Sequence, residues 1–482
     1  MNYEPVIGLE VHAELLTKSK MFCGCEVVDS ITAKPNRYIC PVCTGQPGSL
    51  PVLNKKAVEL AVRVGLALNC EIHTESIFAR KNYFYPDLPK GYQISQYDQP
   101  LATNGKIQIE TEAGIKEVRI RRVHLEEDTG KSLHMGDGGR IGQADYSLED
   151  FNRAGTPLVE IVSEPDIQSP EQAREFVQEL RAILEYLGVS DVRMEEGSLR
   201  VDANVSVAPE GERGVKVEIK NMNSVRSVHR ALVYEEQRQA KAINGGEKIL
   251  QETRHWDEKA AVTLGGRAKE GSSDYRYFPE PDLVPVEPSV EWLRQLREEI
   301  PQLPSALRVW LKTELSLSDE DAQVLTSSKQ MADFFAEAIG AAKTASAKQL
   351  SNWLVNDVTR ALSEARLELS GSKLAAESFA RLIDIVADGE VTARQGKEVL
   401  AQMMATGKQP EAVIEESGFE VSGEEEIVRA VDEAIASNAG VAERIKAGDD
   451  KPLGVLVGAV MKQTKGRADP KLAEEVLRKL LS

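Results

Sequence analysis

Residues that can bind metal or phosphate alternate with apolar residues in several short stretches of this chain. The first stretch, V-I-G-L-E-V-H-A-E-L from Val6, places Glu10 and His12 on one face of a predicted strand, because successive strand side chains point to opposite faces. Carboxylate and imidazole groups in one row can hold a hard divalent cation, and such a cation can bridge two phosphates of a nucleotide. The stretch therefore predicts a site for Mg²⁺ or Mn²⁺.

Four further stretches extend the same pattern of polar and apolar faces. Two regular ones, L-R-V-D-A-N-V-S-V from Leu199 and V-K-V-E-I-K from Val215, supply polar rows whose members could contact phosphate or substrate: Arg200, Asp202, Asn204 and Lys220. H-L-E-E-D from His124 and T-P-L-V-E-I-V-S-E from Thr156 are less regular. An ordinary solvated strand face explains a single Glu-x-His pair, but repeated rows of this kind favour an antiparallel sheet whose polar face is an active site.

Carboxylates on neighbouring strands are expected to complete the metal site. The predicted ligands are Glu10, His12 and Glu126, with Glu160 and Glu252 as additions. The sequence contains no G-x-x-x-x-G-K-[ST] phosphate loop, so ATP would be bound on a sheet surface by metal, Arg and Lys.

Four of the five cysteines are close together in the sequence, as Cys-Gly-Cys at 23 and 25 and Cys-Pro-Val-Cys at 40 and 43. Two close pairs separated by a short loop can place four thiolates around zinc in a closed structural site. The single residue inside the first pair is fewer than usual. Four unrelated reduced cysteines is the alternative, and a catalytic zinc is disfavoured because no ligand position stays open.

Composition indicates a protein of several domains that is not targeted to a membrane. The chain has 482 residues, a net charge of -18 and no long apolar run, and we expect it to be cytoplasmic. Strand-like alternation gives way to helical spacing after Pro285, and a second boundary lies near residues 404–410. We expect an α+β fold with domains at 1–292, 293–407 and 408–482, the last two helical.

The tail and two aromatic stretches offer weaker signals for RNA. Lys462, Lys465 and Arg467 form a short basic end that can contact phosphates, although a solvated helix end is the simpler interpretation. Tyr and Phe lie among Lys and Arg in the stretches from Lys81 and Asp274, where they can stack on a base or pack on a sheet edge. The negative net charge argues only weakly against nucleic acid.

Six motifs together resemble one subunit of the aspartyl/glutamyl-tRNA(Asn/Gln) amidotransferases, the subunit that activates the tRNA-bound amino acid. They are G-L-E-V-H-A-E-L from Gly8, C-P-V-C-T-G-Q-P-G-S-L-P from Cys40, N-Y-F-Y-P-D-L-P-K-G-Y-Q-I-S-Q-Y from Asn82, H-L-E-E-D-T-G-K from His124, D-F-N-R-A-G-T-P-L-V-E-I-V-S-E-P-D from Asp150 and D-Y-R-Y-F-P-E-P-D-L from Asp274. The resemblance runs over essentially the whole chain.

The resemblance implies a cradle with a glutamine-synthetase-like sheet and a zinc knuckle, then a helical domain, then a helical tail that holds the tRNA. It implies an enzyme that activates the side-chain carboxyl of Glu-tRNA(Gln) or Asp-tRNA(Asn) with ATP. Ammonia would come from a partner amidase (glutaminase) subunit, and a small third subunit would complete the heterotrimer. On this basis Glu10, His12 and Glu126 bind the metal, and Arg200, Asp202, Asn204 and Lys220 contact phosphate or substrate.

Two other classes of function stay open from the residues. One is a zinc-containing RNA-binding scaffold whose polar sheet face carries no chemistry, and the other is an independent small-molecule ligase. The G-S-S-D stretch at Gly271 lacks the context of an amidase signature, so amidase chemistry in this chain is disfavoured.

Overall fold

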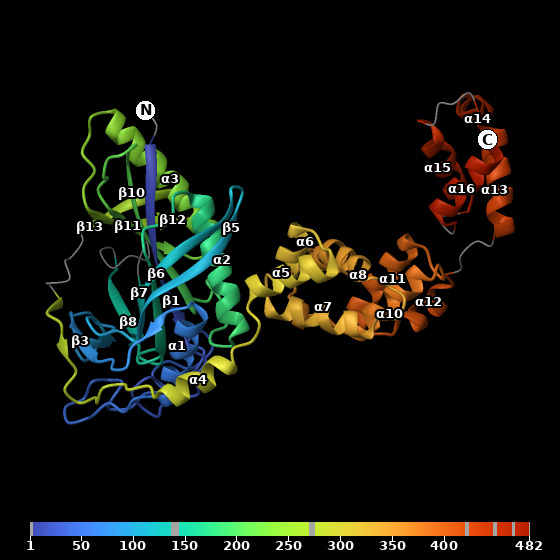
Figure 1. Cartoon of the computed structure of the whole chain (residues 1–482). Helices are drawn as coiled ribbons and strands as arrows, with labels where there is room; N and C mark the ends of the chain where they lie inside the picture. Colours follow the sequence, from blue (N-terminus) through green and yellow to red (C-terminus); the bar gives the residue numbers. More distant parts are fainter. Residues whose placement is uncertain are drawn as a thin grey trace. The chain divides into compact units, whose positions relative to one another are not determined.

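The computed structural model describes residues 3–135, 144–268, 275–419, 424–446, 451–464 and 468–481. The chain forms two compact units, Met1–Ser305 and Ala306–Ser482 (Figure 1). The first unit mixes strands and helices, and the second is helical wherever it is described. The predicted α+β class, with strands first and helices after them, is confirmed.

Within the described residues, the main sheet of the first unit has nine strands in the order β13-β12-β11-β10-β1-β9-β6-β5-β2. The strands are β1 (Tyr3–Glu14), β2 (Glu71–Ile72), β5 (Ala102–Thr111), β6 (Gly114–Glu127), β9 (Pro157–Ser163), β10 (Leu199–Pro209), β11 (Val217–Met222), β12 (Glu252–Asp257) and β13 (Val262–Ala268). The sheet is antiparallel as predicted, except that β11 and β12 run parallel.

Alternation along β1 and β10 divides the sheet into two faces, as predicted. The residues Ile7, Leu9, Val11, Ala13, Leu199, Val201, Ala203, Val205 and Val207 are at most 2 % exposed. They belong to the core of the first unit, together with residues of α1 (Lys55–Ala67), α2 (Pro170–Tyr186) and α3 (Val225–Asn244). Because these helices bury the apolar face, the polar face is left to form a site.

Helices α1, α2 and α3 were not predicted, although each begins at a recognisable cap. The side chains of Asn54, Ser169 and Ser224 accept hydrogen bonds from the first backbone N–H groups of these helices. Ser169 is followed by Pro170 at the first helical position, a common start signal.

Two smaller sheets and a fourth helix complete the first unit. Strand β3 (Phe78–Asn82) lies between β4 (Tyr92–Gln96) and β14 (Phe278–Pro279), and β7 (Lys131–Met135) pairs with β8 (Tyr146–Asp150). Helix α4 (Val290–Glu298) contributes Leu296 to the first core. The predicted domain limit at residue 292 falls inside this helix.

The second unit contains two separate hydrophobic clusters among its described residues. The first, from Leu311 to Val413, is formed mainly by the helices α5 (Pro304–Leu315), α6 (Asp319–Leu325), α7 (Lys329–Ala341), α8 (Ala347–Asn352), α9 (Thr359–Ala365), α10 (Ala376–Ala387), α11 (Ala393–Thr406) and α12 (Pro410–Ser417), with a π-helix at Trp353–Val358 and a 3₁₀ turn at Leu369–Gly371. The second, from Ile427 to Leu481, is formed by α13 (Glu424–Ser437), α14 (Ala439–Lys446), α15 (Leu453–Gln463) and α16 (Pro470–Leu481). The predicted limit at 407/408 precedes α12, whose Val413 packs in the first of these clusters.

Candidate active site and metal centres

Strand register brings polar side chains from four strands into one row across the sheet. His12 on β1 is opposite Arg200 on β10 and opposite Glu160 on β9, and Glu160 is in turn opposite His124 on β6. Directly opposed residues have Cβ atoms about 5 Å apart, so side chains in such a row can meet. Glu126 lies two residues beyond His124 and therefore on the same face of β6.

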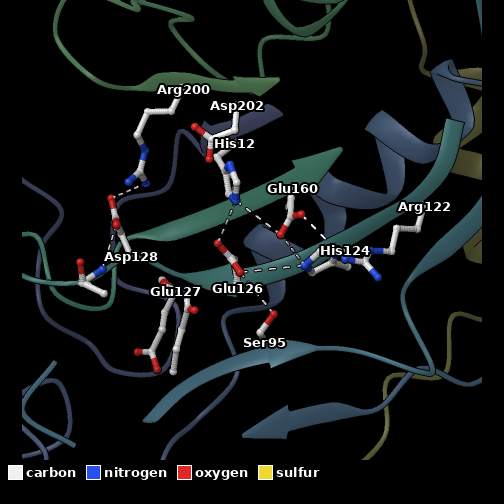
Figure 2. Close-up of polar contacts among 12 residues, drawn as sticks. His12, Ser95, Arg122, His124, Glu126, Glu127, Asp128, Glu160, Arg200 and Asp202 are labelled. Atoms are coloured by element: carbon white, nitrogen blue, oxygen red, sulfur yellow. Dashed lines mark hydrogen bonds and ion pairs between the residues drawn. The ribbon is translucent and has the colours of Figure 1, made fainter. Parts of the chain in front are cut away.

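Three of these side chains converge on one point. His12 Nε2 lies 3.6 Å from Glu126 Oε1 and 3.4 Å from Glu160 Oε2 (Figure 2). One ligand atom from each of the three residues lies within 4.8 Å of the other two. One imidazole nitrogen and two largely buried carboxylates form a donor set that fits Mg²⁺ or Mn²⁺.

His124 orients one of the two carboxylates. His124 Nε2 lies 2.9 Å from Glu160 Oε2, and Arg122 Nη2 lies 3.9 Å from Glu160 Oε1. Burial alone would raise the pKa of Glu160, but His124 and His12 outweigh burial and hold that pKa well below its ordinary value. Glu160 is therefore ionised, as a metal ligand must be.

His12 is held as a cation when no metal competes for its nitrogen. Burial lowers the pKa of His12, but the charge and hydrogen bond of Glu160 and the charge of Glu126 outweigh it and raise the pKa to about 9. A divalent cation at this point would replace that proton, because an imidazole must be neutral to ligate a metal.

A cavity of about 410 Å³ opens on this row of side chains. Its lining includes His12, Glu126, Asp128, Arg200, Asp202 and Lys220. Ligand sites in proteins range from roughly 300 to 1,000 Å³, so the cavity is large enough for a small molecule or part of a nucleotide. The metal cluster and three of the predicted phosphate or substrate contacts therefore share one space.

The cations of this cavity are held by carboxylates. Arg200 Nη2 donates to Asp128 Oδ2 at 2.8 Å, and Lys220 Nζ donates to Asp202 Oδ2 at 2.5 Å (Figure 2 draws the Arg200 contact). Burial opposes ionisation of Asp128, but Arg200 and Arg153 outweigh it and keep the pKa of Asp128 below its ordinary value. The carboxylates place two positive charges at fixed points on the cavity wall.

Substituting Asp128→Asn is expected to lower stability by about 1–3 kcal/mol, because it leaves Arg200 with a neutral partner. A depressed carboxylate pKa contributes stability that is present above the unfolded pKa near 4 and is lost as pH falls through the folded value. The difference between wild type and Asp128→Asn should therefore be constant from pH 6 to 8 and shrink below about pH 4, as urea titrations can measure.

Asp166→Asn is the matched control for this substitution. Asp166 also pairs with an arginine in the first unit, but that partner, Arg119, is 66 % exposed in its side chain. Exposed pairs contribute roughly 0–1 kcal/mol. Equal losses in Asp128→Asn and Asp166→Asn would contradict a structural role for the Asp128–Arg200 pair.

The structure separates three other predicted residues from the metal cluster. Glu10 Oε1 accepts a hydrogen bond from Asn204 Nδ2 at 2.8 Å, and neither belongs to the group around His12. Glu252 lies on β12, three strands away from β1 in the sheet, where its Oε1 lies 2.7 Å from Arg254 Nη1. The roles predicted for Glu10, Asn204 and Glu252 stay predictions.

The four predicted cysteines form a second cluster. Their Sγ atoms lie within 4.8 Å of one another, and the Sγ atoms of Cys40 and Cys43 are 3.9 Å apart. Tetrahedral zinc with bonds near 2.3 Å needs sulfur atoms about 3.8 Å apart, so the cluster fits that geometry. A hydrogen bond from Cys23, against the effect of burial, lowers the pKa of Cys43 to about 5, and the charge of Lys20 adds to the lowering.

The predicted RNA contacts of the tail are described only in part. Lys462 is exposed in the last turn of α15, whereas Lys465 and Arg467 lie outside the described residues. In the first unit, the rings of Tyr97 and Tyr277 stack with centroids 4.2 Å apart, and Lys81 Nζ lies 5.0 Å from the centre of the Tyr275 ring. The aromatic stretches from Lys81 and Asp274 therefore meet in space.

Comparison with known proteins decides the family. Residues 5–294 match the model of the GatB/GatE catalytic domain, and residues 333–481 match the model of the GatB domain. The chain belongs to the GatB family of amidotransferase subunits. The row of metal and phosphate ligands therefore lies in the part of the chain that matches the family's catalytic domain.

Full-length relatives carry one shared name. The chain is 48% identical to the GatB subunit of aspartyl/glutamyl-tRNA(Asn/Gln) amidotransferase from Persephonella marina, and both chains are covered over 100% of their length. It is 50% identical to the protein of that name from Caldanaerobacter subterraneus subsp. tengcongensis, with the same coverage. Identity to the Thermotoga maritima protein is 49%, over 100% of this chain and 99% of the relative.

Three residues that the geometry singles out were not predicted as site residues. His124 and Asp128 lie in the H-L-E-E-D stretch, where alternation from Glu126 would have placed both on the polar face. Lys20 lies beside Cys43, and nothing in the sequence signals that contact. No helix among the described residues is long and apolar enough to cross a membrane.

Proposed function

We propose that this chain is the transamidating subunit of a tRNA-dependent amidotransferase. It would phosphorylate the side-chain carboxyl of mischarged Glu-tRNA(Gln), Asp-tRNA(Asn) or both with ATP, and then replace the phosphate with ammonia. The products are Gln-tRNA(Gln) and Asn-tRNA(Asn) for translation. This is the chemistry of an ATP-dependent carbon–nitrogen ligase with glutamine as amido donor, and we expect it to take place in the cytoplasm.

One observation carries this proposal: the three metal-binding side chains and the cations Arg200 and Lys220 border the same cavity. A carboxylate resists attack by ammonia because its oxygen is a poor leaving group. An oxygen of the carboxylate therefore attacks the terminal phosphorus of ATP, and ADP leaves. Phosphoryl transfer depends mostly on positioning and on stabilisation of charge, which is what this cavity wall offers.

The residues divide this work between two walls of the cavity. His12, Glu126 and Glu160 would hold Mg²⁺, which when bound neutralises charge on the phosphates. Arg200 and Lys220 would contact phosphate oxygens while Asp128 and Asp202 keep them in place. Glu10, Asn204 and Glu252 would act at the edge of the site, as further metal or substrate contacts.

Ammonia then attacks the carbonyl carbon of the acyl phosphate. A carbon–nitrogen bond forms, the carbon–oxygen bond to the phosphate breaks, and inorganic phosphate leaves while the nitrogen loses a proton. Ammonia would be delivered by the partner amidase, with a small third chain completing the complex. The names of the relatives, which describe one subunit of an amidotransferase, support a complex of several chains.

The remaining parts of the chain would support this reaction. The first unit would act as a cradle with a sheet like that of glutamine synthetase. Zn²⁺ would be bound by Cys23, Cys25, Cys40 and Cys43 as a structural ion, and the helical tail with Lys462, Lys465 and Arg467 would bind the tRNA. The fit of the four Sγ atoms supports the zinc assignment.

The test is reconstitution of the chain with its amidase and small partner subunits. We expect conversion of Glu-tRNA(Gln), Asp-tRNA(Asn) or both to the amide, only when ATP, Mg²⁺ and glutamine are all present. The tRNA that is converted identifies the substrate. Tight tRNA binding without ATP-dependent amide formation would instead support the scaffold, and turnover of a free amino acid without tRNA would support the small-molecule ligase.

A further inference from the structure

Lys20 is a buried cation whose position the proposed reaction does not explain. Its side chain is fully buried, with 0 % of the residue exposed. Burying an ammonium group costs several kcal/mol unless an opposite charge or hydrogen bonds compensate. Among the residues that the structure describes, no carboxylate lies within ion-pair distance of Lys20; its Nζ lies 3.7 Å from Cys43 Sγ and 3.2 Å from the carbonyl oxygen of Phe151.

The cysteine cluster can supply the missing negative charge. Four thiolates around Zn²⁺ carry a net charge of -2, so a buried ammonium beside one sulfur neutralises part of that charge. Hydrogen bonds from outside the ligand set orient the ligands and stabilise the metal. Lys20 is in place to do this for Cys43.

The second contact of Lys20 leads toward the cavity. Phe151 begins the segment Phe151–Thr156, in which Arg153 donates to the carbonyl oxygens of Thr129 at 3.1 Å and Gly130 at 2.7 Å. Arg153 Nε also lies 3.5 Å from Asp128 Oδ2, the oxygen that holds Arg200. Lys20 is thus two short steps from the phosphate-facing wall.

Backbone hydrogen bonds make the same connection a second time. The amide of Met21 donates to the Gly155 carbonyl at 2.7 Å, the amide of Gly155 donates to the Asp128 carbonyl at 2.9 Å, and the amide of Asp128 donates to the Thr156 carbonyl at 2.8 Å. Gly155 has φ of +86°, and a Cβ there would lie 3.5 Å from Lys20 Cδ and 3.6 Å from Cys43 Cβ. The segment therefore packs directly against both residues.

We propose that Lys20 is a positioning residue that couples the four-cysteine metal site to the Asp128–Arg200 pair of the cavity. Its ammonium group balances the charge of the metal–thiolate cluster, and it holds the segment Phe151–Thr156 that keeps Asp128 in place. Zinc would then act on the cavity through this segment rather than by chemistry of its own. This inference uses the zinc assignment made above but not the transamidation reaction.

The first experiment measures zinc affinity of the full chain against a chromophoric chelator, 4-(2-pyridylazo)resorcinol. Lys20→Met is expected to weaken zinc binding by roughly 10–100-fold, the range seen when an outer partner of a metal ligand is lost. Lys20→Arg should restore most of the affinity because it keeps the charge. Lys18→Met is the matched control, since Lys18 is exposed two residues away, and it should bind zinc as wild type does.

The second experiment measures hydrogen exchange at the amides of Met21, Gly155 and Asp128 in the wild-type chain. Removing zinc should speed exchange at all three, and the amides of Ile107 and Val118, in the β5–β6 ladder, should stay unchanged. Lys20→Met saturated with zinc should show faster exchange at Gly155 as well. Because the comparison with and without zinc needs no variant, it decides the question even if Lys20→Met fails to fold.

Three results would overturn the proposal. They are zinc affinity in Lys20→Met within twofold of wild type, exchange at the three amides that does not respond to zinc, and a wild-type chain that binds no zinc. None of these measurements uses ATP or tRNA, so their failure is distinguishable from failure of the transamidation reaction.

Discussion

Glu160→Gln is expected to reduce ATP-dependent amide formation by the reconstituted complex by at least roughly 100-fold, the usual cost of losing one charge-stabilising group. Glu160 lies between His12 and His124, with its Oε2 3.4 Å and 2.9 Å from their Nε2 atoms. The amide keeps the shape of the side chain but removes the negative charge that a divalent cation needs. Glutamine hydrolysis by the partner amidase should continue, because that reaction takes place on another chain.

Glu252→Gln is the matched control for Glu160→Gln. Both residues were predicted as metal ligands from the sequence, but Glu252 lies three strands from β1 and pairs with Arg254. We expect Glu252→Gln to lose less than about fivefold and Glu10→Gln, whose partner is Asn204, to be intermediate. If Glu252→Gln and Glu160→Gln lose the same activity, the metal is not held at the cluster that the structure shows.

A second titration would locate the metal on the same three residues. Raising Mg²⁺ should recover part of the activity of Glu160→Gln if its defect is weakened metal binding. It should leave wild type unchanged once saturated. A variant insensitive to Mg²⁺ at every concentration would point to a defect in folding or in tRNA binding, and tRNA affinity measured in parallel separates these two.

Cys43→Ala is expected to abolish stoichiometric zinc binding. Loss of a direct ligand should exceed the roughly 10–100-fold that loss of an outer partner costs, because three thiolates cannot close a tetrahedral site. The structural consequence should be local: the segment from Cys23 to Cys43 loses the free energy of metal binding, on the order of 10 kcal/mol in zinc-finger peptides. Elemental analysis of the purified chain and limited proteolysis within residues 23–43 measure the two effects.

Cys70→Ala is the control for Cys43→Ala. Cys70 is also buried, but it lies outside the cluster, and burial raises the pKa of its thiol to about 12, so it stays protonated. This variant should keep one zinc per chain and lose only the roughly 1 kcal/mol of a small core truncation. Zinc retained by Cys43→Ala would show that the four cysteines are not the ligands.

The sequence by itself was sufficient for the faces of the strands and for the class of the fold. Alternation in β1 and β10 predicted which residues are buried, because a strand side chain has only two directions available. Helical spacing after Pro285 predicted a helical second half for the same kind of local reason. The cysteine pairs predicted their own cluster, since short loops leave the four thiols little choice of partner.

Local pattern was insufficient wherever two segments far apart in sequence had to meet. Alternation assigned Glu10, Glu160 and Glu252 to polar faces alike, but only strand order and register decide which of them lies beside His12. Register puts Glu160 opposite His12, and strand order puts Glu252 three strands away. A shift of one residue would have sent these side chains to the other face of the sheet.

The tertiary structure alone decided the contacts of Lys20 and Asp128. Lys20 meets the carbonyl of Phe151, 131 residues later, and Asp128 meets Arg200, 72 residues later. Nothing local distinguishes these two charged residues from solvated ones, because their burial is produced by packing of the segment Phe151–Thr156 against both. The sequence determined which side chains could do chemistry, and the packing of the sheet and its loops determined which of them share one cavity.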